Sequence, residues 1–277
     1  MSVKDILVHI NVSKHCPARV ETAAQLAKAF DARLTALYTS AVGDVPFFMM
    51  EEVGAKVEPT MRAWWLQMRD KVKAGFDRAM SKAGTAAEWI EVDDRDGSVV
   101  SHHARYADLV IVGQIDQDEL LPRPEYAIPE RVALESGAPT LVVPHAGTPA
   151  AVGRKILIAW NGSAQSARAV RDAFPFLARA ERVTVLTINP DAHQSKFGPP
   201  GSRIAAHLSN HGIMADVREL TVAESAIGDT ILAQAADSDS DLIVMGAYGH
   251  PRAYEVVLGG ATRTLFRQMT VPILMSH

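Results

Sequence analysis

Asp108-Leu-Val-Ile-Val-Gly113 and Asp241-Leu-Ile-Val-Met-Gly246 are two copies of one pattern: an aspartate, four apolar residues and a glycine. A second pair follows in the same register, because Ala138-Pro-Thr-Leu-Val-Val143 corresponds to Thr270-Val-Pro-Ile-Leu-Met275. The same 133 residues separate the two glycines and the two prolines. A register shared over such a stretch indicates an internal duplication.

The duplication extends to the opening strands, where Val3-Lys-Asp-Ile-Leu-Val8 corresponds to Gly153-Arg-Lys-Ile-Leu-Ile158. Between the copies lies Gly147-Thr-Pro-Ala-Ala-Val-Gly153, a turn-rich connector that leaves little room for independent motion. The boundary is expected near Pro149, which gives two domains, 1–148 and 149–277.

Short β-branched runs alternate with helix-length amphipathic stretches, which is typical of βαβ units. The predicted strands are Ile6–Ile10, Leu34–Thr39, Glu88–Val92, Leu109–Val112, Thr140–Val143, Ile156–Trp160, Val183–Ile188, Ala215–Glu219, Leu242–Met245 and Pro272–Met275. The predicted helices are Ala18–Phe30, Met61–Met80, Ala164–Ala178 and Ala223–Ala236.

The fold class that these elements predict is α/β, with two tandem doubly wound, Rossmann-like domains related by a pseudo-two-fold axis. Each domain should contain a five-stranded parallel sheet with helices on both faces, because parallel strands need right-handed crossovers. The apolar closing strands, Thr140–Val143 and Pro272–Met275, would be exposed edges in isolated domains. They are therefore expected to meet at the centre of the tandem, as an intramolecular pseudo-dimer, or to pair with another chain in a homodimer.

Composition excludes several classes of protein. The 277 residues are 48% hydrophobic and 22% charged with a net charge of -4, which is ordinary for a globular chain and gives no basic face for nucleic acid. No apolar run reaches the length of a membrane span, and the start of the chain does not resemble a signal peptide. The single cysteine, Cys16, fits a reducing compartment, so a cytoplasmic location is expected.

The richest local signal runs from Gly246 through Gly249 to Gly259, Gly260 and Thr262. Gly246 ends a buried strand at the carboxyl edge of the sheet, where open α/β folds bind ligands, and a glycine lets a ring or ribose approach the backbone. Gly249 permits a sharp turn, and Gly259 and Gly260 open a helix whose free N–H groups and dipole attract phosphate. The Thr262 hydroxyl adds a donor there.

The spacing glycine, two residues, glycine, nine residues, glycine resembles the nucleotide-binding pattern of ATP-binding universal stress proteins. In that family the last glycine is followed by Ser or Thr, then by a further residue and Thr. This sequence has Gly260 in place of the first hydroxyl residue and retains Thr262. The resemblance implies an ATP site in which phosphate contact is weakened rather than abolished.

Two further positions match the family. The family's aspartate after the first strand corresponds to Asn161 in Trp160-Asn-Gly-Ser163, which keeps hydrogen-bonding capacity and brings no charge. Ile188, at the end of the next strand, matches the apolar residue that packs on adenine. His250 lies beside Gly249, and no residue near the glycines stands out as a water-activating base.

The first half lacks this pattern. Only Gly113 is retained, whereas Asp116, Tyr126 and Pro129 stand where the second half has Gly249, Gly259 and Thr262. The first half also carries an apolar insertion, Val45–Met50, before the helix with Trp64 and Trp65. These residues are expected to cover core or the contact between domains, with a lid over a small apolar ligand as the alternative.

The predicted function is an ATP-binding regulatory protein of the stress response, with slow or no hydrolysis, a site in the second half and no catalytic residue. ATP, with or without Mg, is the expected cofactor, and a protein partner is expected but not identified. Two alternatives stay open: a nucleotide-free interaction scaffold, and a weak ATP hydrolase or adenylating enzyme. His207 and His211 have no third ligand at diagnostic spacing, so no metal site is predicted.

Overall fold

The strands fall close to their predicted positions in the computed structural model, which describes residues 2–40, 47–93, 98–115, 128–145, 151–190, 198–247 and 260–277. They are β1 (Asp5–Ile10), β2 (Arg33–Ser40), β3 (Ala87–Asp93), β4 (Leu109–Gly113), β5 (Thr140–Val143), β6 (Lys155–Ala159), β7 (Arg182–Ile188), β8 (Ala215–Leu220), β9 (Leu242–Gly246) and β10 (Ile273–Ser276).

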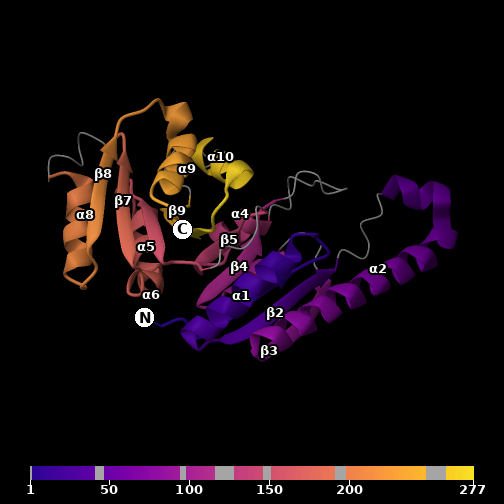
Figure 1. The fold of residues 1–277 in the computed structure, drawn as a ribbon. Helices are drawn as coiled ribbons and strands as arrows, with labels where there is room; N and C mark the ends of the chain where they lie inside the picture. The colour runs from indigo at the N-terminus through magenta and orange to yellow at the C-terminus, as the bar shows by residue number, and fades with distance from the viewer. Residues whose placement is uncertain are drawn as a thin grey trace.

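All of these strands belong to one continuous sheet, in the order β3-β2-β1-β4-β5-β10-β9-β6-β7-β8. The first half (β1 to β5) and the second half (β6 to β10) have the same internal order, and each is parallel throughout. They join where β5 and β10 pair antiparallel, with Leu141 opposite Leu274 (Figure 1). The predicted meeting of the closing strands at the centre of the tandem is confirmed.

The central strands are buried on both faces, as runs of aliphatic residues predict. In β4, β5, β9 and β10 nearly every residue is buried. The edge strand β8 is largely exposed and carries Asp216, Arg218 and Glu219. Charged residues on an edge strand oppose pairing with further chains, so the sheet ends there.

The helices form a layer on each face of the sheet. They are α1 (Cys16–Phe30), α2 (Phe47–Ala83), α3 (Ser98–Ala104), α4 (Ile128–Glu135), α5 (Ala164–Asp172), α6 (Phe174–Leu177), α8 (Pro200–Ser209), α9 (Ile227–Asp237) and α10 (Gly260–Gln268), with a short 3-10 turn η2 (Glu224–Ala226). One apolar core lies under α1, α2, α5, α6 and α8, and the other lies under α3, α4, α9 and α10. The sheet therefore separates two cores that both run through the two halves.

Three predicted helices differ from the structure. The stretch Ala164–Ala178 is two helices, because Pro175 cannot donate a backbone hydrogen bond and so begins a new one. The stretch Ala223–Ala236 opens with the 3-10 turn before α9 starts. Helix α2 is longer than predicted and includes the backbone of the apolar run from Phe47.

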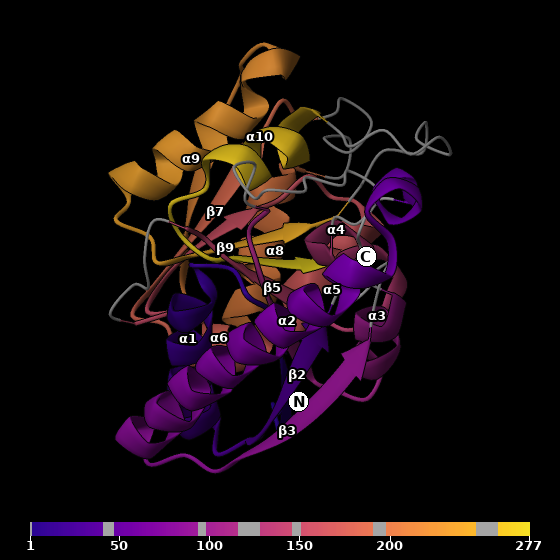
Figure 2. The ribbon, with the colours of Figure 1, turned by 90° about the vertical axis from the view of Figure 1, so that its right-hand side faces the viewer.

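Helix α2 extends beyond the sheet. Figure 1 shows its first part projecting away from the body of the molecule, and Figure 2 looks onto its side with α1 beside it. Trp64 is 49% exposed, so this residue does not cover core as expected. The side chain of Trp65 and the residues 45–46 lie outside the described part. Among the described residues, no helix has the length and apolarity to cross a membrane.

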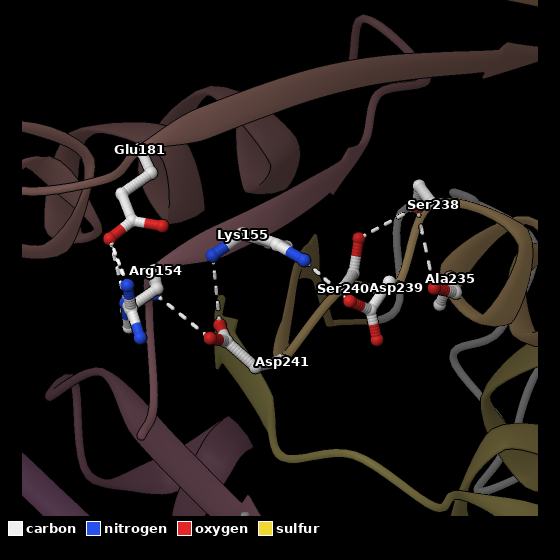
Figure 3. Close-up of polar contacts among 8 residues, drawn as sticks. All are labelled: Arg154, Lys155, Glu181, Ala235, Ser238, Asp239, Ser240 and Asp241. Atoms are coloured by element: carbon white, nitrogen blue, oxygen red, sulfur yellow. Dashed lines mark hydrogen bonds and ion pairs between the residues drawn. The ribbon is translucent and has the colours of Figure 1, made fainter. Parts of the chain in front are cut away.

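The aspartate of the repeated pattern fastens the opening strand of each half. Asp241 accepts hydrogen bonds from the backbone N–H of Gly153 (2.8 Å), Arg154 (3.1 Å) and Lys155 (3.1 Å). Figure 3 shows the bonds from Arg154 and Lys155. Asp108 accepts equivalent bonds from Lys4 (2.7 Å) and Asp5 (3.0 Å). Both aspartates act at the amino edge of the sheet, opposite the predicted ligand edge.

Candidate functional site at the carboxyl edge of the second half

The carboxyl ends of β7, β6 and β9 lie next to one another in the sheet. Helix α5, which follows β6, packs on one face, and α10, which follows β9, packs on the other. The helices that follow β6 and β9 therefore lie on opposite faces, which makes a topological switch point at the ends of these strands. Open α/β sheets bind their ligands in the crevice at such a point.

Asn161 follows β6 and is exposed at this crevice. Its Oδ1 accepts hydrogen bonds from the Ser163 backbone N–H (3.1 Å) and hydroxyl (2.7 Å). The Ser163 hydroxyl oxygen in turn accepts from the backbone N–H of Ser166 (3.1 Å) and caps α5. The Asn161 carbonyl oxygen is thus used to shape the turn, and its amide nitrogen is the group that can donate to a ligand.

Ile188 is level with Asn161 on the neighbouring strand. Ala159 of β6 pairs with Leu186 of β7, so two residues further along each chain Asn161 stands opposite Ile188. The backbone N–H of Trp160 donates to the Leu186 carbonyl at 2.8 Å. Ile188 is half-buried on the α9 and α10 face. Its side chain can present apolar surface beside the crevice.

Gly246 ends β9, and its missing side chain is needed for packing. A Cβ atom there would lie 2.5 Å from the Ser166 backbone nitrogen and 2.6 Å from the Gln165 carbonyl carbon. The close backbone approach at Gly246 is therefore made by the first turn of α5. Contact of Gly246 with a nucleotide stays a prediction.

The start of α10 is described from Gly260 onward. Gly260 is exposed, and a Cβ atom there would meet nothing within 4 Å. Thr262 is buried, with 5% of its surface exposed. The other predicted site residues, Gly249, His250 and Gly259, lie outside the described residues. The structure thus describes Asn161, Ile188, Gly246, Gly260 and Thr262, on elements that surround the switch point.

The first half has the same switch point, between β1 and β4, with an arginine in it. Asn11 matches Asn161, and its Oδ1 accepts hydrogen bonds from Ser13 N–H (3.4 Å) and from Arg19 Nη2 (2.7 Å). The Arg19 guanidinium lies directly over Gly113, and the residue is 5% exposed. Burial, with the nearby Arg19 charge, lowers the pKa of His9 well below its usual value.

Sequence reasoning did not single out Asn11, Arg19 or Trp160. The alignment of the opening strands, extended by a few residues, pairs Asn11-Val-Ser13 with Asn161-Gly-Ser163, so the sequence itself indicates that Asn11 matches Asn161. The indole N–H of Trp160 is buried beside Asn161 and has no hydrogen-bond partner in the described part of the chain. Among those residues, no group of three His, Cys, Asp or Glu side chains could hold a metal ion.

Comparison with known proteins gives a match to a family model for the second half and a fold for the whole chain. Residues 153–277 match the sequence model of the universal stress protein family. A universal stress protein from Archaeoglobus fulgidus DSM 4304 superposes with a TM-score of 0.75 at 14% identity, covering 98% of this chain and 96% of that one. A functionally unknown protein from Pseudomonas aeruginosa PAO1 gives 0.58 at 13% identity, over 99% and 92% of the two chains.

A universal stress protein in complex with cAMP matches 52% of this chain over 99% of its own, at 21% identity and a TM-score of 0.37. The sequence matches none of the curated proteins with which it was compared. At these identities the full-length likenesses establish the fold alone.

Proposed function

Since residues 153–277 match the sequence model of the universal stress protein family, we propose that this half binds an adenine nucleotide, with ATP as the expected ligand. The chain would act as a regulatory protein of the stress response, with slow or no hydrolysis. The first half, residues 1–148, would be a second domain of the same fold that does not bind the nucleotide.

The observation that supports this site is the set of groups around the β6–β9 switch point. Asn161 offers an amide donor, Ile188 offers apolar surface, and the exposed N-terminus of α10 begins at Gly260. A helix N-terminus attracts phosphate through its free N–H groups and its dipole. An adenine nucleotide needs one apolar surface, one or two polar contacts and one anion cradle, and this edge can supply all three.

The asymmetry between the halves rests on Arg19. Its side chain occupies the first-half crevice, bonded to Asn11 and lying over Gly113. In the second half the position that matches Arg19 is Ala169, which is buried in the core. We therefore expect calorimetry with ATP to give a stoichiometry near one, and mass spectrometry of the denatured protein to detect an adenine nucleotide.

Asn161→Asp with Asn11→Asp as its matched control tests the location. Aspartate keeps the oxygen that shapes the turn but has no N–H to donate to the ligand, so Asn161→Asp should weaken ATP binding about 2- to 13-fold. Asn11→Asp should leave the affinity unchanged. The opposite pattern, or two equivalent sites, would place the nucleotide elsewhere and defeat the proposal.

The interaction scaffold is the second candidate, and the exposed Trp64 and Leu66 on α2 favour it. Exposed large apolar side chains often mark contacts with a partner protein. If ATP does not bind at millimolar concentration and no nucleotide leaves the denatured protein, the scaffold becomes the leading function.

A further inference from the structure

A groove lies between α1 and α2 in the first half. Figure 2 shows the two helices that form its walls. Its volume of about 460 Å³ falls within the range of small-molecule sites. The residues that line it are Ile10, Ser13, Lys14, Cys16, Pro17, Val20, Glu21, Lys71, Val72, Gly75, Phe76, Arg78, Ala79 and Lys82.

The floor of the groove is apolar. Ile10, Val20 and Phe76 are each at most 4% exposed, and Val72 and Ala79 pack against the same core. No part of this floor belongs to the carboxyl edge of the second half. A hydrocarbon group placed on it would be removed from water, which is favourable in proportion to the area buried.

The rim of the groove is cationic. Lys14, Lys71, Arg78 and Lys82 stand against a single acidic residue, Glu21, and all five are exposed at the surface. The three cations on α2 are spaced seven and four residues apart, which puts them on one face of the helix. From Lys71 to Lys82 that helix rises about 16 Å. The groove is therefore long and apolar below, with positive charge along its mouth.

Gly75 stands in the middle of this cationic face. Glycine is unfavourable in a helix interior compared with alanine. A Cβ atom at Gly75 would meet nothing within 4 Å, and its φ is not positive. Neither packing nor backbone conformation requires a glycine there, so its effect is to leave the centre of the groove open.

We propose that the α1–α2 groove binds a long-chain carboxylate, with the alkyl chain on the apolar floor and the carboxylate at the Lys71, Arg78 and Lys82 rim. The positive charge of the rim favours an anionic ligand, and the length of the groove favours a ligand with a long alkyl chain. This inference does not depend on nucleotide binding, because the groove and the β6–β9 crevice lie in different halves.

The first test is titration of the purified, delipidated full chain with dodecanoate below its micelle concentration. Calorimetry should give one site per chain. Cys16, the single cysteine, lines the groove and is 4% exposed, so its reaction with a thiol reagent is slow and should slow further as dodecanoate fills the site. Absence of binding, or binding that leaves Cys16 equally reactive, overturns the proposal.

Gly75→Leu tests the opening, with Ala74→Leu as the matched control. Ala74 is exposed on the same helix and does not line the groove. The leucine at Gly75 has room to extend into the groove, so dodecanoate affinity should fall about tenfold or more, which is the effect of losing one or two kilocalories of contact. Ala74→Leu should leave it unchanged. Equal affinities in the two folded variants refute the site.

Charge is tested separately. Arg78→Ala should weaken dodecanoate binding about 2- to 5-fold, the range of an exposed ion pair, whereas Lys28→Ala, on α1 outside the groove, should have no effect. Dodecanol should bind less tightly than dodecanoate. If the alcohol binds as tightly and both alanine variants bind normally, the rim does not recognise a carboxylate and the proposal is wrong.

Discussion

Adding one methyl group at Gly246 should destabilise the second half. The new Cβ would lie 2.5 Å from the Ser166 backbone nitrogen, and backbone cannot rotate away as a side chain can. Gly246→Ala is expected to cost about 1–3 kcal/mol of unfolding free energy, the usual range for overpacking. Gly260→Ala, where a Cβ meets nothing, should leave stability nearly unchanged. Urea denaturation of the two variants measures this, and equal stabilities would contradict the packing role of Gly246.

His9 should make stability depend on pH. Burial and the Arg19 charge hold its folded pKa well below the unfolded value of about 6.5. As the pH falls below that value, His9 binds a proton in the unfolded chain but stays neutral in the folded chain. The unfolding free energy of the wild type should therefore fall by up to about 1.4 kcal/mol per pH unit more than that of His9→Gln, until the pH reaches the folded pKa. Urea denaturation at pH 7.5, 6.5 and 5.5 tests this, and parallel pH curves would exclude it.

At the scale of elements, the sequence predicted strands better than helices. Each strand is a run of apolar residues between polar ends, so β5 and β9 agree with expectation to within one residue. Helix ends depend on single residues such as Pro175, and α2 starts at Phe47 instead of near Met61 because the helix continues through Pro59. The position of the Arg19 side chain could not be predicted, because its contact with Gly113 joins residues far apart in the sequence and leaves no local sequence pattern.

The opening strand β6 should depend on Asp241. Asp241→Ala leaves three backbone N–H groups without their acceptor, which should cost about 1–3 kcal/mol of unfolding free energy. Asp239→Asn is the control, because Asp239 forms an exposed ion pair with Lys155 and asparagine tolerates its positive φ of 51°. That variant should unfold like the wild type. If both variants are equally stable, the aspartate repeat does not fasten the strand.

At the scale of the whole molecule, the continuous sheet should make the halves unfold together. Leu141 and Leu274 are paired at the centre and fully buried. Leu274→Ala is expected to cost about 2–5 kcal/mol, as large-to-small core changes do. Hydrogen exchange should show that amides of β1 and of β7 lose protection by a similar amount. Loss confined to the second half would mean that the halves unfold independently.

The pairing of β5 with β10 also changes how the molecule responds to dilution. Where two separate chains meet through such strands, the fraction paired follows mass action and falls with their concentration. Here both strands belong to one chain, so each is held at the high effective concentration that covalent linkage gives. Neither half can exchange its partner for another copy without breaking the sheet. Each molecule therefore carries one half whose switch point holds Arg19 and one half with Ala169 at the matching position, in a ratio fixed at synthesis whatever the amount of protein in the cell.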